Sequence, residues 1–305
     1  MADTPGVANL AIAPPASVGE ETVGTLREYA RAISGDVGGK VAIGFLLLLV
    51  ILALSASFIS GDPDALLGAE TLKSHPPSWA YPFGTDLLSR DVFARMVHGT
   101  RISMRIAVLA AVLSGVVGLL WGAAAGYIGG FVDQLLMRTV DTMLAIPRVL
   151  LVITVISLWP EVTPGLLILL LGLTGWFGVS RLSRAQALGI RQREFVHAAR
   201  ALGVSRVRIL VRHVIPHALG PVLVATTIGV GQVLVLEAGL TYLGLGVRAP
   251  TATWGSIIHD GRETLLQTWW LLLFPGMALI GTSLAVNAIA HRLRVVIHPR
   301  HLPGR

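Results

Sequence analysis

The chain of 305 residues contains no cysteine, few charged residues and few aromatic ones. Without cysteine, neither a disulfide framework nor a thiolate metal site can form. Only 13% of the residues are charged whereas 53% are hydrophobic, and the mean hydropathy is +0.72. A soluble domain of this length carries more charge and fewer apolar residues. The composition therefore predicts an integral membrane protein.

Signals for several other classes are also missing. No G-x-x-x-x-G-K-[ST] phosphate loop occurs, so no ATP-hydrolysing site is predicted on this chain. The nine histidines are scattered, without H-E-x-x-H or comparable spacing, which argues against a membrane-embedded enzyme. The first 39 residues lack the apolar core of a signal peptide. Within them, residues 21–34 have the pattern of a short amphipathic helix at the membrane surface, with a frayed terminus as the alternative.

Long apolar stretches are abundant. A transmembrane helix needs roughly 20 mainly apolar residues to cross a hydrocarbon core about 30 Å thick. Six stretches reach or approach this length, and together they predict an all-α polytopic membrane protein with six transmembrane helices. They are 41–60, 103–128, 139–159, 164–181, 217–238 and 268–290.

Lysine and arginine are concentrated on one side of these spans, which predicts that both termini lie in the cytoplasm. The same asymmetry explains the formal net charge of +7, so contact with anionic lipid is expected and nucleic-acid binding is not. Five segments follow from this orientation. They are a partly disordered cytoplasmic N-terminal segment at 1–40, the first transmembrane helix at 41–60, an extracytoplasmic segment at 61–102, a transmembrane core at 103–290 and a cytoplasmic tail at 291–305.

Glycines within the spans have helical spacing. Gly118, Gly122 and Gly126 lie four residues apart on one helix, a pattern that lets two helix backbones approach closely in lipid. We interpret this pattern as tight packing within a bundle and not as a ligand site. The same interpretation applies to a second set in the fourth span: Gly172, Gly175 and Gly178.

Prolines predict bends in three spans. Pro147 is expected to kink the third helix and Pro275 the sixth, because proline removes a backbone hydrogen bond. Pro221 is expected in the first turn of the fifth helix, where proline is well tolerated.

Carboxylates are rare in the spans, and none is predicted near the midplane, where a proton-coupled carrier would need one. Glu237 is expected near the outer end of the fifth span, and Asp133 and Asp141 at the inner start of the third. Asp133 and Arg138 are close enough along the chain to form an ordinary ion pair at the interface.

Residues 194–216, EFVHAARALGVSRVRILVRHVIP, form a polar, arginine-rich segment within the transmembrane core. Ala198 and Ala199 give a first helix a small-residue face, and Gly203 permits a sharp turn at its end. Helical periodicity resumes over 206–215, before Pro216. The pattern predicts a helix–turn–helix elbow in the cytoplasm, suited to a groove on another protein. The alternative is a solvated basic loop, which explains the arginines but not the ordered alanines and glycine.

The spacing of Ala198-Ala199, Gly203 and Pro216 resembles the EAA loop of permease subunits of ATP-binding-cassette importers. Four further segments are similar, in order, to the C-type subunit of the dipeptide, oligopeptide and nickel permease subfamily, and together they cover roughly residues 80–300. They are YPFGTDLLSRDVFARMVHGTRIS at 81–103, DQLLMRTVDTMLAIPRVLL at 133–151, EAGLTYLGLGVRAPTATWGSIIHDGR at 237–262 and HPR at 298–300. In the elbow, His197 replaces the glutamate that gives the EAA loop its name.

The resemblance implies a set of partners and a location. They are a second permease subunit, cytoplasmic ATPase subunits that bind the elbow, and an extracytoplasmic solute-binding protein, in the plasma (inner) membrane of a bacterium or archaeon. It implies that ATP and magnesium are bound by the ATPase subunits, with no cofactor or metal on this chain. The elbow would act as a coupling helix during alternating access, with Ala198, Ala199 and Gly203 as its docking core. The resemblance also assigns coupling roles to Arg206, Arg208 and Pro216.

The expected substrates are dipeptides or oligopeptides, with nickel or another small solute as the alternative. An ion-coupled secondary transporter is a more distant alternative, since such proteins need a coupling-ion site near the midplane and often an inverted repeat.

Two outer motifs have two interpretations each. FGTD at 83–86 and the adjacent Arg90-Asp91 are expected to form turns and a helix cap, with substrate contact as the alternative. Trp254, Trp269 and Trp270 are expected to anchor the protein at the outer membrane boundary, with stacking on a peptide as the alternative.

Overall fold

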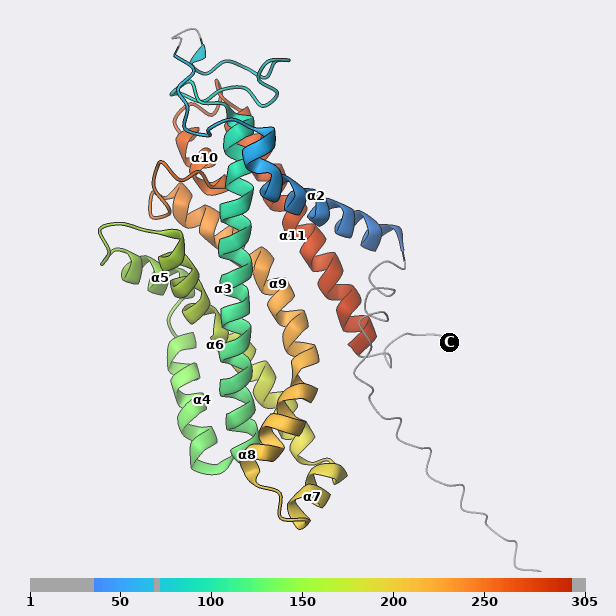
Figure 1. Cartoon of the computed structure of the whole chain (residues 1–305). Helices are drawn as coiled ribbons and strands as arrows, with labels where there is room; N and C mark the ends of the chain where they lie inside the picture. The colour runs from blue at the N-terminus through green and yellow to red at the C-terminus, as the bar shows by residue number, and fades with distance from the viewer. Residues whose placement is uncertain (1–35, 69–71, 298–305) are drawn as a thin grey trace, which may run out of the picture.

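The computed structural model describes residues 36–68 and 72–297, and this part of the chain contains helices and no β-strand. The predicted all-α polytopic architecture is confirmed (Figure 1). The expectations for residues 21–34 and 298–300 lie outside the described residues.

The helices are α2 Val37–Ile59, α3 Val92–Ile128, α4 Gly130–Leu144, α5 Arg148–Ile156, α6 Pro164–Arg191, α7 Glu194–Ala201, α8 Arg206–Ile209, the π-helix η2 Leu210–Val214, α9 Ile215–Tyr242, α10 Trp254–Asp260 and α11 Trp270–Ile297.

Five stretches of the described chain are long and apolar enough to cross a membrane as single helices, and α4 with α5 forms a sixth that is bent by 81°. The prediction of one kinked helix at 139–159 is therefore wrong, because the helix stops at Leu144 and restarts at Arg148. Pro147 lies directly before α5. Proline has no backbone N–H to donate and disfavours helical geometry in the residue before it, so the helix breaks here instead of bending.

Two other spans differ from prediction at their ends. The helix α3 begins at Val92 and not at 103, because Asp91 caps it: the Asp91 carboxylate accepts a hydrogen bond from the Phe93 N–H at 2.9 Å. Pro221 lies inside α9 and not in its first turn, because α8, η2 and α9 continue one another from Arg206 to Tyr242. Arginines lie in the first turns of α3 and in the segment before α9. Because these residues are charged, a search for apolar stretches leaves out these parts of the two helices.

The contact between α3 and α6 is the closest in the bundle and confirms the predicted role of the glycines. A Cβ atom on Gly122 would overlap the Ser180 carbonyl oxygen, and one on Gly126 would come within 2.6 Å of the Arg184 carbonyl oxygen. Hydroxyl groups cross the same contact: Ser183 donates to the Leu119 carbonyl at 2.9 Å. The second glycine set is only partly confirmed. Gly172 and Gly175 pack against α3 through Leu113 and Ser114, whereas Gly178 has no neighbour within 4 Å.

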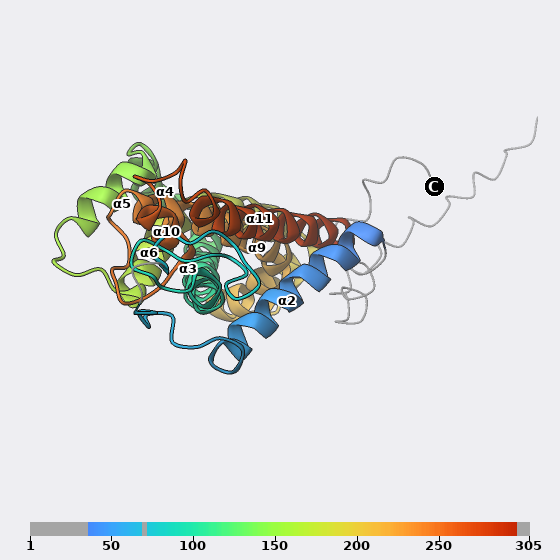
Figure 2. The ribbon, with the colours of Figure 1, turned by 90° about the horizontal axis from the view of Figure 1, so that it is seen from above.

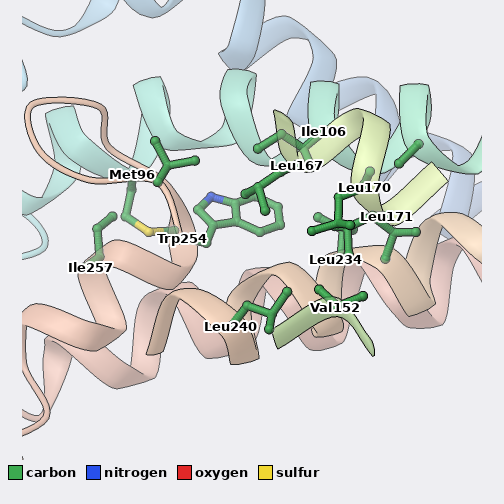
Figure 3. Close-up of a cluster of buried hydrophobic side chains, with 14 of the residues drawn as sticks. Met96, Ile106, Val152, Leu167, Leu170, Leu171, Leu234, Leu240, Trp254 and Ile257 are labelled. Carbon is green, nitrogen blue, oxygen red and sulfur yellow. The ribbon is translucent and has the colours of Figure 1, made fainter. Parts of the chain in front are cut away.

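The outer half of the bundle is built around Trp254, which is completely buried (Figure 3). Its ring lies among apolar side chains of α3 and α6, and its Nε1–H donates to the Thr100 hydroxyl at 3.2 Å. Trp270 is also buried and donates to the Thr85 carbonyl at 3.0 Å, while Trp269 is half-exposed. The prediction of interfacial anchoring is therefore wrong for Trp254 and Trp270, whose rings and N–H groups are used inside the fold.

The helix α2 is the least buried of the five single-helix spans and diverges from the bundle, with α11 and α3 as its neighbours (Figure 2). Phe58, for example, is 92% exposed. An ion pair between Asp36 and Arg292 joins the start of α2 to the last turns of α11. The first and last spanning helices therefore meet at the ends that lead to the two termini.

Substitution of Gly122 by alanine tests the α3–α6 contact. We expect the free energy of unfolding to fall by more than about 2 kcal/mol, because the methyl group collides with a backbone oxygen that cannot rotate away. Gly178→Ala on α6 is the matched control, and its stability should be unchanged or raised by up to about 1 kcal/mol. Thermal unfolding of the purified protein in detergent measures both, and equal stability of the two variants would contradict the packing role.

Candidate functional site

The segment 194–216 is a helix–turn–helix elbow in the structure, as its pattern predicted. The helix α7 ends in a Schellman motif: the Val204 N–H donates to the Ala199 carbonyl at 3.1 Å, and the Gly203 N–H donates to the Arg200 carbonyl at 3.0 Å. Gly203 has φ +77°, a left-handed conformation that glycine adopts without strain. The turn then leads into α8, η2 and α9, which run on as one helical rod through Pro216.

The elbow lies at one end of the molecule, beyond the ends of α3 and α4 (Figure 1). Its inner side is fixed by a buried apolar cluster that α3, α6, α7, α8 and α9 share. Val196 and Ile209 are completely buried there, and Ala199 and Val204 pack against the cluster from its edge. The elbow is therefore a rigid extension of the spanning helices and not a flexible loop.

The six predicted coupling residues divide between two environments. Ala199 is half-buried and faces the apolar cluster, so its small size serves packing inside the chain. The other five are exposed and available to a partner: Ala198, Gly203, Arg206, Arg208 and Pro216. Ala198 lies on α7, Gly203 in the turn, and Arg206 and Arg208 on α8.

Two apolar side chains on the elbow were missed by the sequence interpretation. Leu202 is 84% exposed and Val207 is 70% exposed, on either side of Gly203. Exposed apolar side chains gathered around a turn are typical of contact surfaces. A signal was present for one of them, because Val207 and Val211 are four residues apart and share a helix face opposite the buried Ile209.

The carboxylates at the inner end of α4 pair with α6. Asp133 accepts two hydrogen bonds from the Arg184 guanidinium, at 2.6 and 2.7 Å, and Asp141 accepts one from Arg181 at 2.5 Å. The predicted pairing of Asp133 with Arg138 is therefore wrong. Arg138 is five residues from Asp133 on α4, and residues at this spacing point to different faces of a helix. Arg184 lies on α6, and its planar guanidinium matches both carboxylate oxygens.

A cavity of about 620 Å³ opens between α5, α9 and α11. Its walls are mainly aliphatic, and its polar groups are the amides of Gln232 and Asn287 and the hydroxyl of Ser283. Both amide residues are exposed in this chain although they lie in spanning helices. Because amides facing lipid are costly, this face is one that water or another protein chain covers.

Glu237 on α9 is completely buried beside α10 and does not face the cavity. One carboxylate oxygen accepts a hydrogen bond from the Thr241 hydroxyl at 3.1 Å, and the other has no partner among the described residues. No group of three or more carboxylate or imidazole side chains that could hold a metal occurs in the described part of the chain.

The outer segment is attached to the bundle by a buried ion-pair network. The Asp86 carboxylate accepts hydrogen bonds from Arg90 at 2.6 Å and from Arg95 at 2.7 Å. Both arginines also contact Asp260 at the end of α10, at 2.9 and 2.8 Å. The network therefore holds three elements together: the segment before α3, α3 itself and α10.

The FGTD motif forms the turn that its residue types predicted. Gly84 has φ +73°, and a Cβ atom there would come within 2.7 Å of the His75 carbonyl oxygen. The Thr85 hydroxyl accepts a hydrogen bond from the His75 N–H at 2.9 Å. Asp91 caps α3, and its partial burial raises its pKa above the ordinary aspartate value. Through these contacts the motif stabilises the turn before α3 and the start of that helix.

The fold and these sites define a polytopic membrane protein with a rigid elbow at one end and a cavity between its spanning helices. The chain belongs to the family of binding-protein-dependent transport system inner membrane components, which it matches over residues 118–302. This match includes the whole elbow.

Curated relatives cover most of the chain. It is 37% identical over 264 residues to the oligopeptide transport system permease protein OppC of Bacillus subtilis, covering 86% of this chain and 84% of that one. It is 36% identical over 288 residues to the dipeptide transport system permease protein DppC of the same organism, covering 93% and 88%. A putative peptide transport system permease protein of Brucella abortus is 37% identical over 274 residues, covering 89% and 90%. The predicted membership of the ATP-binding-cassette importer permeases is confirmed.

Substitution of Arg95 by glutamine tests the outer network. The Arg95 and Asp86 side chains are only 4% and 1% exposed, so loss of Arg95 leaves Asp86 and Asp260 to share Arg90 and the network with an excess negative charge. We expect the free energy of unfolding to fall by about 3 kcal/mol or more. The control is Arg262→Gln, which removes an exposed pair with Glu263 and should change stability by less than about 1 kcal/mol. Thermal unfolding distinguishes them, and a neutral Arg95→Gln would refute the anchoring role.

Proposed function

We propose that this chain forms half of the translocation pathway of an ATP-driven importer for dipeptides or oligopeptides, and that cytoplasmic ATPase subunits move it through the elbow. One observation carries the proposal: α8, η2 and α9 form a continuous rod. One end of this rod is the elbow and its other half lines the cavity through Gln232 and Gly239. A displacement of the elbow therefore moves a wall of the cavity without an intervening flexible joint, which is the coupling that alternating access requires.

The partners follow from the surfaces. The exposed edge of the elbow, with Leu202, Val207, Arg206 and Arg208, fits a groove on an ATPase subunit that has apolar and acidic groups. The cavity is open on one side, and a second permease subunit would complete it. An extracytoplasmic binding protein would deliver substrate at the opposite end. ATP and magnesium would be bound by the ATPase subunits, and this chain would hold no cofactor and catalyse no reaction.

The orientation we propose places the elbow and both termini in the cytoplasm of a bacterium or archaeon, with the chain in the plasma (inner) membrane. It is supported by the excess of arginine at the elbow end. The contact between Asp36 and Arg292 supports termini on a common side, because it joins the two helix ends that lead to them.

Peptides are proposed as substrate because of the named relatives and the chemistry of the cavity. Aliphatic walls suit varied side chains, and the amides of Gln232 and Asn287 can bond to a peptide backbone. Nickel or another small solute imported by the same machinery is the alternative. An ion-coupled carrier is supported less, because the one carboxylate in the spanning part of α9, Glu237, is enclosed away from the cavity.

Substitution of Gly203 by valine tests the coupling role. A β-branched residue is strained at φ +77°, so the turn should distort and substrate-stimulated ATP hydrolysis by the assembled complex should fall at least about tenfold. No neighbour lies within 4 Å of a Cβ at this position, so the effect comes from the backbone and not from a clash. Gly203→Asn is the control, since asparagine tolerates this conformation, and it should keep most of the coupling. Normal coupling in the valine variant would sink the proposal.

A strain that lacks this gene tests the substrate. It should fail to grow when defined dipeptides or oligopeptides are the only nitrogen source, and the wild-type gene should restore growth. Growth on ammonium serves as the control. Unimpaired peptide uptake, with impaired uptake of nickel, would favour the alternative substrate.

A further inference from the structure

A second, smaller pocket lies between the elbow and the spanning helices. Its volume is about 330 Å³. It is formed where the end of α3, the end of α6 and the turn of the elbow meet (Figure 1). Its lining residues are Tyr127, Ile128, Arg191, Arg200, Val204 and Arg206.

The pocket carries an uncompensated positive charge. Its three arginines form no ion pair with a carboxylate among the described residues, unlike Arg181 and Arg184, which lie two to three turns earlier on α6. The helices α3, α6 and α7 each end near the pocket, and each helix C-terminus supplies only about half a unit of negative charge. Three guanidinium groups exceed this partial charge, so the pocket is short of an anion.

A buried hydroxyl points to the same conclusion. Tyr127 is 3% exposed, and its hydroxyl is buried without a hydrogen-bond partner within residues 36–68 and 72–297. Arg200 lies over the Tyr127 ring, 5.2 Å from its centre, so the two groups are held together. Buried hydroxyls without partners are rare, because each costs free energy. An oxygen-rich anion would accept the hydroxyl hydrogen and the guanidinium hydrogens together.

We propose that this pocket binds a phosphate group, and that the phosphate belongs to the headgroup of an anionic phospholipid in the cytoplasmic leaflet. Guanidinium groups match phosphate oxygens in pairs, and a cluster of them selects phosphate. Basic pockets between spanning helices on this side of a membrane are suited to lipid headgroups.

The depth of the pocket favours lipid over a side chain of the ATPase. Its floor is Tyr127 and Ile128, the last turn of the spanning helix α3, so the pocket lies where headgroups lie. Ile128 is 38% exposed and Phe131, on the following turn, is 76% exposed. These side chains offer an apolar surface to acyl chains directly beside the charged pocket. An ATPase groove would instead meet the exposed edge at Leu202 and Val207.

A bound headgroup would have a mechanical consequence. It would join α3 and α6, through Tyr127 and Arg191, to the elbow, through Arg200 and Arg206. The lipid would thus stiffen the attachment of the elbow to the bundle. The inference relies on the proposed function only for placing the elbow at the cytoplasmic face.

The test uses the assembled transporter, reconstituted in nanodiscs of phosphatidylcholine alone or with phosphatidylglycerol. Native mass spectrometry counts the phosphatidylglycerol that remains bound after transfer to detergent. We expect retention by the wild type, at least about a tenfold loss of affinity in Arg191→Gln/Arg200→Gln, and about a fivefold loss in Tyr127→Phe, which removes only the hydroxyl. Arg138→Gln, which removes an exposed arginine on α4 outside the pocket, is the control for loss of a positive charge elsewhere and should retain lipid.

Inorganic phosphate, added to delipidated complex, distinguishes the source. The proposal is supported if phosphate competes with phosphatidylglycerol for the wild-type complex and if this competition is weaker in the pocket variants. Binding of inorganic phosphate without retention of phosphatidylglycerol would overturn lipid as the source. If lipid retention is the same in all variants and the arginine variants instead lose their ATPase subunits, the occupant is a partner carboxylate and the proposal is wrong. The Gly203→Val variant distinguishes this inference from the proposed function. Loss of ATPase coupling with normal lipid retention supports the proposed function independently of the lipid site, and normal coupling with lost lipid retention does the opposite.

Discussion

The rest of the structure depends on the close approach of α3 and α6. The helix α3 carries no side chain at Gly122 and Gly126, where a Cβ would overlap or crowd the backbone of α6. In lipid, apolar side chains gain little by meeting each other, so close backbone packing and crossing hydroxyl bonds such as that from Ser183 stabilise the pair. Every other spanning element is positioned relative to this pair. The helix α9 packs along both, α4 is held to α6 by Asp133 and Arg184, and α10 packs its tryptophan onto α3.

Different interactions stabilise the structure at the two ends of the α3–α6 pair. At the outer end, Asp86, Arg90, Arg95 and Asp260 join three elements through buried charges that compensate one another. At the elbow end, apolar burial of Val196 and Ile209 holds the elbow in place. Buried charges fix geometry strongly because breaking one pair leaves another charge exposed to a low dielectric. Apolar packing is less directional than these charge pairs.

The elbow and the cavity belong to one mechanical unit. The rod from Arg206 to Tyr242 contains a π-helical turn at Leu210–Val214, directly between the elbow and the cavity wall. Such turns lack the regular hydrogen-bond spacing of an α-helix and often mark functional positions. Pro221 follows in the second turn of α9. Neither irregularity interrupts the rod, which continues from the elbow to the cavity wall.

The sequence alone determined the membrane class, the approximate positions of the spans and the helix–turn–helix of the elbow. These properties depend on local hydropathy and on Gly203, whose backbone conformation is decided within a few residues. Tertiary structure alone decided the burial of Trp254 and the partner of Asp133. It also decided that three arginines from α6 and the elbow line one pocket with Tyr127, whose hydroxyl is buried. The reason is physical: these features depend on which distant segments meet, and a side chain of one type is equally compatible with several partners until packing selects one.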